Sequence, residues 1–174
     1  MIETKHTDLN LRIATEEDLG LILWFVKELA SYENLLHEVK ATEESLRDVI
    51  FNRKIAKAVI AEYAGEPSGF AIFYYSLSTF IGRPAIYIED LFVKPDMRRK
   101  GIGNALLSYL ASLAKENNCW GLEWSCLNWN ESSIEFYRSL GAVPRDEWTI
   151  YRLSGTDLDN LASKCNQTKQ ENIK

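Results

Sequence analysis

Three consecutive segments of strand-type alternation constrain the fold of this chain more than any other feature. They cover residues 58–63, 69–77 and 85–93, and two short turn-forming stretches separate them. The first stretch is Gly65-Glu66-Pro67, and the second runs from Thr79 to Pro84. Three strands joined by such short links are typical of an antiparallel meander. We therefore expect residues 58–93 to form three consecutive strands, each paired antiparallel with the next.

Helical and strand patterns flank this meander on both sides. Four helices are predicted from apolar residues at helical spacing, beginning near Leu19, Thr42, Ile102 and Ser132. Further strands are predicted at residues 11–13, 120–127 and 148–153. The order β-α-α-β-β-β-α-β-α-β predicts an α+β fold with a mixed sheet.

Length and composition limit the organisation and the partners. A chain of 174 residues suits one buried core, so we expect residues 1–162 to form a single domain. The polar residues 163–174 have little to bury and are expected to fray. The net charge of -5 disfavours nucleic-acid binding, because proteins that bind nucleic acids are usually basic or carry a basic face. It contains no apolar run long enough to cross a membrane and no signal-peptide pattern, so a cytoplasmic location is expected.

Cysteine and histidine usage disfavours a metal site and a disulfide framework. The three cysteines are an odd number without CxxC spacing, and both histidines, His6 and His37, lie far from them in sequence. We therefore expect no metal. Cys126 is interpreted as a small buried side chain rather than a nucleophile, because no histidine is placed nearby in sequence to activate it.

The most informative segment is Ile86–Gly103, in which an apolar strand is followed by Pro95, a basic glycine-containing loop and a helix. Backbone N–H groups of residues 99–104 have no intrahelical partner in such a first turn, and glycines at 101 and 103 allow phosphates to approach them. Arg98, Arg99 and Lys100 add local positive charge. The segment therefore suits a pyrophosphate group. The same residues are also compatible with a plain turn that contains two glycines and binds nothing. The segment matches neither the P-loop nor the dinucleotide-binding glycine pattern.

The run Arg98-Arg-Lys-Gly101-Ile-Gly103 resembles the R/Q-x-x-G-x-G/A signature of the GCN5-related N-acetyltransferases. KELASYE at 27–33, IYIEDLFV at 86–93 and WNESSIEFYRSLGA at 129–142 resemble the spermidine/spermine and thialysine acetyltransferase branch of that family. The resemblance runs from Leu11 to about Leu153. It implies the acyl-CoA N-acyltransferase fold, with six to seven strands and about four helices. It also implies acetyl transfer from acetyl-CoA to a primary amine, without a metal, in a homodimer.

Carried over by motif, the resemblance assigns cofactor contacts to three stretches. The strand backbone is expected to pair with the pantetheine arm, the basic loop to hold the pyrophosphate, and the start of the fourth helix to contact the cofactor from the other side. The residues are Leu91, Phe92 and Val93; Arg98, Arg99, Lys100, Gly101, Ile102, Gly103 and Asn104; and Asn130, Glu131, Ser132 and Ser133. Tyr137 falls on the family's tyrosine beside the thioester sulfur.

The chemistry of amine acetylation requires a proton acceptor and stabilisation of the leaving thiolate. An alkylamine has a pKa of about 10.4, so it is protonated at neutral pH and must lose a proton before attack. We assign Glu89 as the amine-binding group and base, acting directly or through water, and Tyr137 as the acid for the thiolate. Strand alternation puts Glu89 on the face of Tyr87 and Leu91, and Asp90 on the opposite face. Asp90 is left between a substrate contact and a structural role.

The resemblance also implies the acceptor contacts, which are Tyr32, Glu33, Glu89, Asp90, Glu123, Trp124 and Ser125. Residues 77–83 contain no acid, where we expect one in the polyamine-acetylating members. Ser78-Thr79 is more similar to the thialysine-acetylating members. A lysine-like amino acid or a small diamine is therefore the preferred acceptor. A non-catalytic CoA-binding regulatory domain and a protein-lysine or N-terminal acetyltransferase remain as alternatives.

Overall fold

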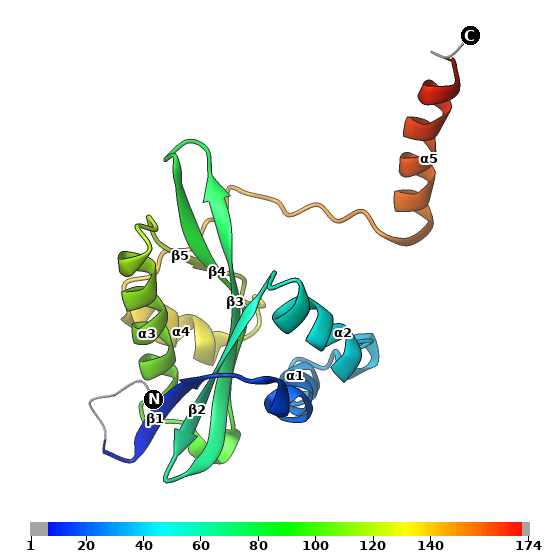
Figure 1. Ribbon diagram of the computed structural model, residues 1–174. Helices are drawn as coiled ribbons and strands as arrows, with labels where there is room; N and C mark the ends of the chain where they lie inside the picture. Colours follow the sequence, from blue (N-terminus) through cyan, green and yellow to red (C-terminus); the bar gives the residue numbers. More distant parts are fainter. Residues whose placement is uncertain (1–6, 172–174) are drawn as a thin grey trace. The chain divides into compact units, whose positions relative to one another are not determined.

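The computed structural model describes residues 7–171 and contains one five-stranded sheet in the strand order β1-β2-β3-β4-β5 (Figure 1). The strands are β1 (Leu9–Ile13), β2 (Lys57–Tyr63), β3 (Glu66–Ser78), β4 (Arg83–Val93) and β5 (Leu122–Trp124). The first four pair antiparallel with their neighbours in the chain, and β5 pairs parallel with β4. The predicted meander is confirmed.

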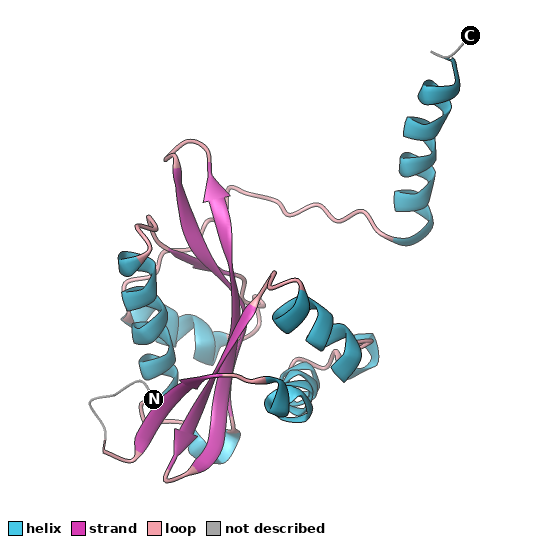
Figure 2. Ribbon diagram, in the orientation of Figure 1, coloured by secondary structure: helices cyan, strands magenta, loops and turns pink. Residues whose placement is uncertain are grey.

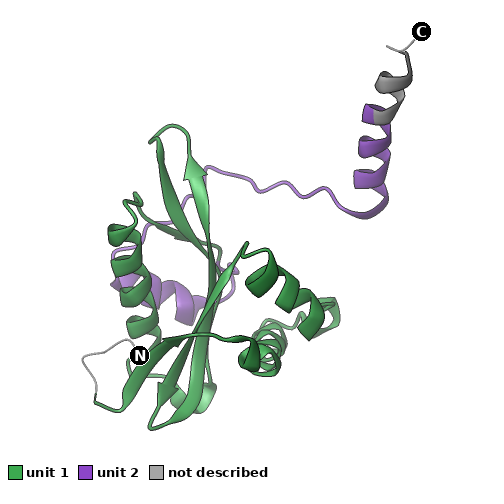
Figure 3. Cartoon of the chain, in the orientation of Figure 1, with its two compact units in different colours: residues 1–125 green, residues 126–174 purple. Residues whose placement is uncertain are grey.

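Helices lie on both faces of the sheet in Met1–Ser125, the first of two compact units (Figures 2 and 3). One face carries α1 (Leu19–Tyr32), the short helix α2 (Glu43–Arg47) and the π-helical turn η3 (Asp48–Asn52); the other carries α3 (Ile102–Glu116). The 3-10 turns are η1 (Glu16–Asp18), η2 (Leu36–Glu38) and η4 (Pro95–Met97).

The core under α1 is built around three aromatic rings. Phe25 of α1 stacks on Phe70 of β3 at 5.0 Å between ring centroids and meets Phe92 of β4 edge-on at 6.2 Å. All three are buried. On the other face, the buried side chains of α3 recur at helical spacing, as the sequence predicts: Ile102, Leu106, Leu110 and Ala114. Backbones approach closely at Gly69, where a Cβ atom would lie 2.8 Å from the carbonyl oxygen of Phe92.

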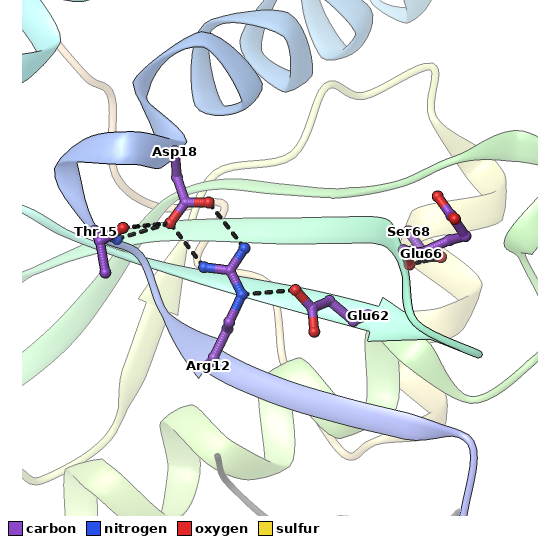
Figure 4. Close-up of polar contacts among 6 residues, drawn as sticks. All are labelled: Arg12, Thr15, Asp18, Glu62, Glu66 and Ser68. Atoms are coloured by element: carbon purple, nitrogen blue, oxygen red, sulfur yellow. Dashed lines mark hydrogen bonds and ion pairs between the residues drawn. The ribbon is translucent and has the colours of Figure 1, made fainter.

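A half-buried ion-pair network joins β1 to the start of α1 and to β2 (Figure 4). The Arg12 guanidinium donates two hydrogen bonds to the Asp18 carboxylate, at 2.7 and 2.8 Å, and one to Glu62 at 2.6 Å. The Thr15 N–H also donates to Asp18, at 2.8 Å. These hydrogen bonds hold the pKa of Asp18 below its ordinary value, chiefly through Arg12.

The second unit, Cys126–Lys174, carries α4 (Glu131–Ser139) and α5 (Gly155–Glu171). Two expectations need correction. The sheet of the described residues has five strands rather than six or seven, and residues 148–153 pair with no strand there. The physical reason is that a strand needs a hydrogen-bonded edge to pair with, and alternation alone does not supply one. Trp148, Ile150 and Tyr151 are instead 64%, 80% and 92% exposed.

The expected polar tail overlaps α5, which runs through Ser163. That the tail frays, and that residues 1–162 form one domain, remain predictions. Residues 172–174 lie outside the described part of the chain. Among the described helices, none is both long and apolar enough to span a membrane.

Candidate active site

A β-bulge in β4 determines where the two central carboxylates point. Ile72 of β3 pairs with Asp90 and Phe73 pairs with Ile88, which leaves Glu89 as the extra residue. Ile72 and Tyr74 are two positions apart on β3 and share a face. Their partners, Asp90 and Tyr87, therefore share that face although they are three positions apart.

The bulge overturns the predicted face for Asp90. Simple alternation grouped Asp90 with Ile88, against Tyr87. In the structure Asp90 lies with Tyr87 and Phe92 on the face covered by α1, and Ile88 lies on the opposite face. An unbroken period of two cannot anticipate this, because one extra backbone residue reverses the side of everything beyond it. Glu89 is exposed, whereas Asp90 is half-buried.

The charges of two further carboxylates act on Asp90, which lies on the α1 side of the sheet. Burial, followed by the charges of Glu89 and Glu33, raises the pKa of Asp90 to about 7. Burial also raises the pKa of Glu33, the residue that caps the C-terminal end of α1. Among the described side chains, those of residues 7–165, no ion pair involves Glu33, Glu89 or Asp90. The sheet face therefore carries unneutralised negative charge next to a group that titrates near neutral pH.

The predicted acceptor residues on β5 divide between the two faces. Glu123 is in register with Tyr87, and Ser125 follows two positions later, so both lie on the face of Asp90. The Tyr87 hydroxyl and the Ser125 hydroxyl are 2.7 Å apart and hydrogen bonded. Trp124 is in register with Ile88 and lies on the other face.

Two tyrosines on the acidic face were missed as site residues by the sequence reasoning. Tyr74 of β3 and Tyr87 of β4 are cross-strand partners, with ring centroids 5.2 Å apart. Burial, the charge of Glu89 and then Tyr87 raise the pKa of Tyr74. The sequence shows that both tyrosines lie in neighbouring predicted strands. It does not give the strand register, which is needed to pair Tyr74 with Tyr87.

The basic loop lies between β4 and α3, as predicted. Arg99 and Gly101 both have positive φ, at 64° and 81°, and Gly101 is the N-cap of the 15-residue helix α3. A left-handed N-cap favours glycine because a Cβ atom is strained there. Because the N-cap is glycine, no side chain at that position covers the N–H groups in the first turn of α3. Arg98, Arg99 and Lys100 precede this turn and are exposed.

The loop also contacts the acceptor side. The Arg98 guanidinium lies 4.6 Å from the centroid of the Tyr32 ring, and its Nε donates to the Val93 carbonyl oxygen at 3.3 Å. Tyr32 is the last residue of α1 and precedes Glu33. One side chain therefore connects the end of β4 with the predicted acceptor residues Tyr32 and Glu33.

The outer edge of β4 is only partly paired. The parallel ladder with β5 covers Ile86, Tyr87 and Ile88 and stops there. Within the described residues, no strand pairs with Leu91, Phe92 or Val93 on that edge. Backbone groups at the end of β4 can thus pair with an extended ligand, which fits the predicted pantetheine contacts.

The remaining predicted site residues belong to the second unit and are described by themselves. Asn130 is the N-cap of α4, and its side-chain oxygen accepts from the Ser133 N–H at 3.3 Å. Glu131, Ser132 and Ser133 form the first turn of that helix. Tyr137 is half-buried on α4, with its ring 5.5 Å from that of Phe136. In the described residues, no group of three or more His, Cys, Asp or Glu side chains is arranged to hold a metal ion.

Comparison with known proteins gives a consistent picture. Residues 24–142 match the model of the Acetyltransferase (GNAT) family. The chain is 37% identical over 166 residues to a thialysine N-epsilon-acetyltransferase of Bos taurus, covering 88% of this chain and 97% of the relative. It is 27% identical to an L-ornithine N5-acetyltransferase of Arabidopsis thaliana, covering 87% and 86%. A solved integron cassette protein of V. cholerae has a TM-score of 0.74 at 28% identity, covering 90% of this chain and 99% of that one.

Proposed function

Because this chain belongs to the GNAT family of acetyltransferases, we propose that it transfers the acetyl group of acetyl-CoA to a primary amine of a small cationic molecule. The observation that carries the proposal is the unneutralised carboxylate group of Glu33, Glu89 and Asp90 beside the unpaired end of β4. Negative charge attracts a cationic acceptor, and Asp90, whose pKa is raised to about 7, provides a second carboxyl that can bind a proton next to the proposed base Glu89.

The residues present fit acetyl-CoA. The basic loop and the glycine N-cap of α3 suit the pyrophosphate, and the free edge from Leu91 to Val93 suits an amide-containing arm. The co-substrate supplies a thioester that is the acyl donor and whose thiol leaves. In the second unit, Asn130 to Ser133 remain proposed cofactor contacts through the resemblance.

The reaction proceeds by direct attack of the amine. Glu89 holds the acceptor and takes the ammonium proton, directly or through water, and Asp90 shares the negative charge. The new N–C bond forms as the C–S bond breaks. The Tyr137 hydroxyl donates a proton to the departing thiolate, and the second proton that the nitrogen loses on becoming an amide restores the phenol. A phenol in that position lowers the activation barrier by on the order of 1–3 kcal/mol.

Among acceptors, a lysine-like amino acid or a small diamine is favoured. The tip between β3 and β4, residues 79–82, contains no acid that would hold the far end of a long polyamine. Similarity to proteins named for thialysine and ornithine acetylation supports the same choice. Putrescine represents the small diamines, and spermidine is the competing long polyamine.

The test is steady-state release of CoA from acetyl-CoA with thialysine, lysine, spermidine and putrescine at pH 7 to 9. We expect turnover with thialysine or lysine to exceed that with spermidine. Tyr137→Phe should lower kcat with little change in the Kd for CoA, and the matched variant Tyr151→Phe, at an exposed position of the same unit, should not. Release at the background rate with every amine, despite CoA binding, would instead favour a non-catalytic CoA-binding domain.

We further propose that the protein is a homodimer and acts in the cytoplasm as a single domain. The family model runs from residue 24 to residue 142, across both units, which supports one catalytic domain. The exposed apolar side chains of residues 148–153 support self-association, because burying them removes apolar surface from water. Light scattering during size-exclusion chromatography tests this, and we expect twice the chain mass for the parent protein and a lower mass for Ile150→Glu.

A further inference from the structure

Tyr74 and Tyr87 form a pair of rings on the acidic face of the sheet. They are directly opposite each other on β3 and β4, and their planes are inclined by 31°. Both are half-buried, so part of each ring stays accessible. The pair shares its face with Asp90, three positions beyond Tyr87, because of the bulge at Glu89.

Neighbouring contacts hold both rings in place. The Tyr87 hydroxyl is fixed by its 2.7 Å hydrogen bond with Ser125, which follows the last residue of β5. Tyr74 packs against the buried cluster that contains Phe25 and Phe70. A ring that is already fixed loses little conformational entropy when a ligand contacts it.

The charge around the rings is negative, and none of the ion pairs among the described side chains of residues 7–165 gives Glu33, Glu89 or Asp90 a cation. Glu89 is close enough to raise the pKa of Tyr74, and Glu33 and Glu89 both act on Asp90. Elsewhere in the first unit, the buried acid Asp18 of η1 and the half-buried acid Glu62 of β2 do have a cation, Arg12. Packing of a cross-strand aromatic pair explains the ring contact, but it does not explain the acids left without a counterion beside it.

Resting on the proposed function, we propose that Tyr74 and Tyr87 form an aromatic wall that binds the ammonium group of the acceptor between ring faces and the carboxylates of Glu89 and Asp90. Ring faces attract a cation through their quadrupole, more strongly where water is excluded. The wall selects a protonated primary amine from neutral molecules of the same shape. It thereby places the amine beside the groups that take its proton.

The test compares the binding of a charged ligand and a neutral one. Dissociation constants are measured by calorimetry, with CoA present, for thialysine and for its analogue in which a hydroxyl replaces the side-chain amine. Tyr74→Leu and Tyr87→Leu should weaken thialysine binding by roughly threefold to thirtyfold. The same variants should change binding of the hydroxyl analogue by less than about twofold and leave acetyl-CoA binding unchanged.

Two variants separate the ring from other effects. Tyr75→Leu changes the adjacent residue, which points to the opposite face and pairs with Ile86, and it should leave thialysine binding unchanged. Tyr87→Phe removes the hydrogen bond to Ser125 and keeps the ring, so it should stay close to the parent protein. Equal losses for the charged and neutral ligands, or a Tyr75→Leu loss as large as that of Tyr74→Leu, would overturn the proposal.

Failure of the wall is distinguishable from failure of the proposed function. A parent protein that binds CoA and neither binds nor acetylates thialysine, lysine, spermidine or putrescine refutes the function itself. A parent protein that acetylates thialysine, with leucine variants that bind it equally well, refutes only the wall.

Discussion

Asp90 should destabilise the folded protein at neutral pH, so Asp90→Asn should make the protein more stable. Folding raises the pKa of this carboxyl from 3.8 to about 7, mainly by burial. A group whose pKa rises on folding binds its proton more tightly in the folded state. Asp90 therefore does not lower the free energy of unfolding at pH 4 and below. As pH rises from about 4 to about 7, the free energy of unfolding falls, because the unfolded state releases this proton and the folded state still holds it.

The size of the effect follows from the same pKa change. At about 1.4 kcal/mol for each factor of ten in proton affinity, the change from 3.8 to about 7 corresponds to about 4 kcal/mol. Asparagine has nearly the same shape and carries no charge. We expect Asp90→Asn to unfold at a higher urea concentration than the parent protein at pH 8, by a margin that shrinks to near zero at pH 4.

The assay is urea unfolding of both proteins at pH 4, 5, 6, 7 and 8. The matched control is Asp96→Asn, at an exposed position in η4, which should show no such pH-dependent gain. Acetylation of thialysine by Asp90→Asn should fall at the same time, because the proposed site loses a negative charge. A variant that is no more stable than the parent at pH 8, or a difference that is constant with pH, would refute the reasoning.

Three further predictions concern the fold and the proposed base. Gly69→Ala should lower the free energy of unfolding by about 1–3 kcal/mol in urea titrations, because its Cβ atom would meet the Phe92 carbonyl oxygen at 2.8 Å; unchanged stability would mean that the strands separate freely. Arg12→Met should cost about 1–3 kcal/mol by leaving Asp18 without its cation, and adding Asp18→Asn should recover part of that loss in a double-mutant cycle. Glu89→Gln should lose activity near pH 7 and regain part of it towards pH 9 as free amine becomes available; an equal loss at every pH would assign Glu89 to binding alone.

Much of the fold was predictable because local patterns and tertiary packing agree. The meander from residue 58 to residue 93 has alternating apolar side chains and turns with glycine, and α3 has its apolar stripe directly after the glycine loop. The family expectation from the loop and the three matching stretches is confirmed. Residues 148–153 show the limit of this reasoning, because their alternation describes a strand whose pairing partner the sequence cannot name.

The sequence named candidate site residues but did not show how their side chains are arranged. No letter in Ile88-Glu89-Asp90 marks an extra residue, so the register that turns Asp90 towards α1 had to come from the structure. The same holds for Tyr74, whose closeness to Glu89 depends on pairing between strands. Whether Glu89 or Tyr137 performs its assigned proton transfer stays a prediction.

The strand order β1-β2-β3-β4 follows the order of synthesis. From β2 to β4 each antiparallel strand pairs with the one made just before it across a short turn, whereas α1 and α2 separate β1 from β2 and α3 separates β4 from β5. The acidic face and its two tyrosines are complete once residue 125 has left the ribosome, whereas Tyr137 is still to come. A nascent chain can therefore build its proposed amine-binding surface before Tyr137, the proposed acid for the thiolate, has emerged.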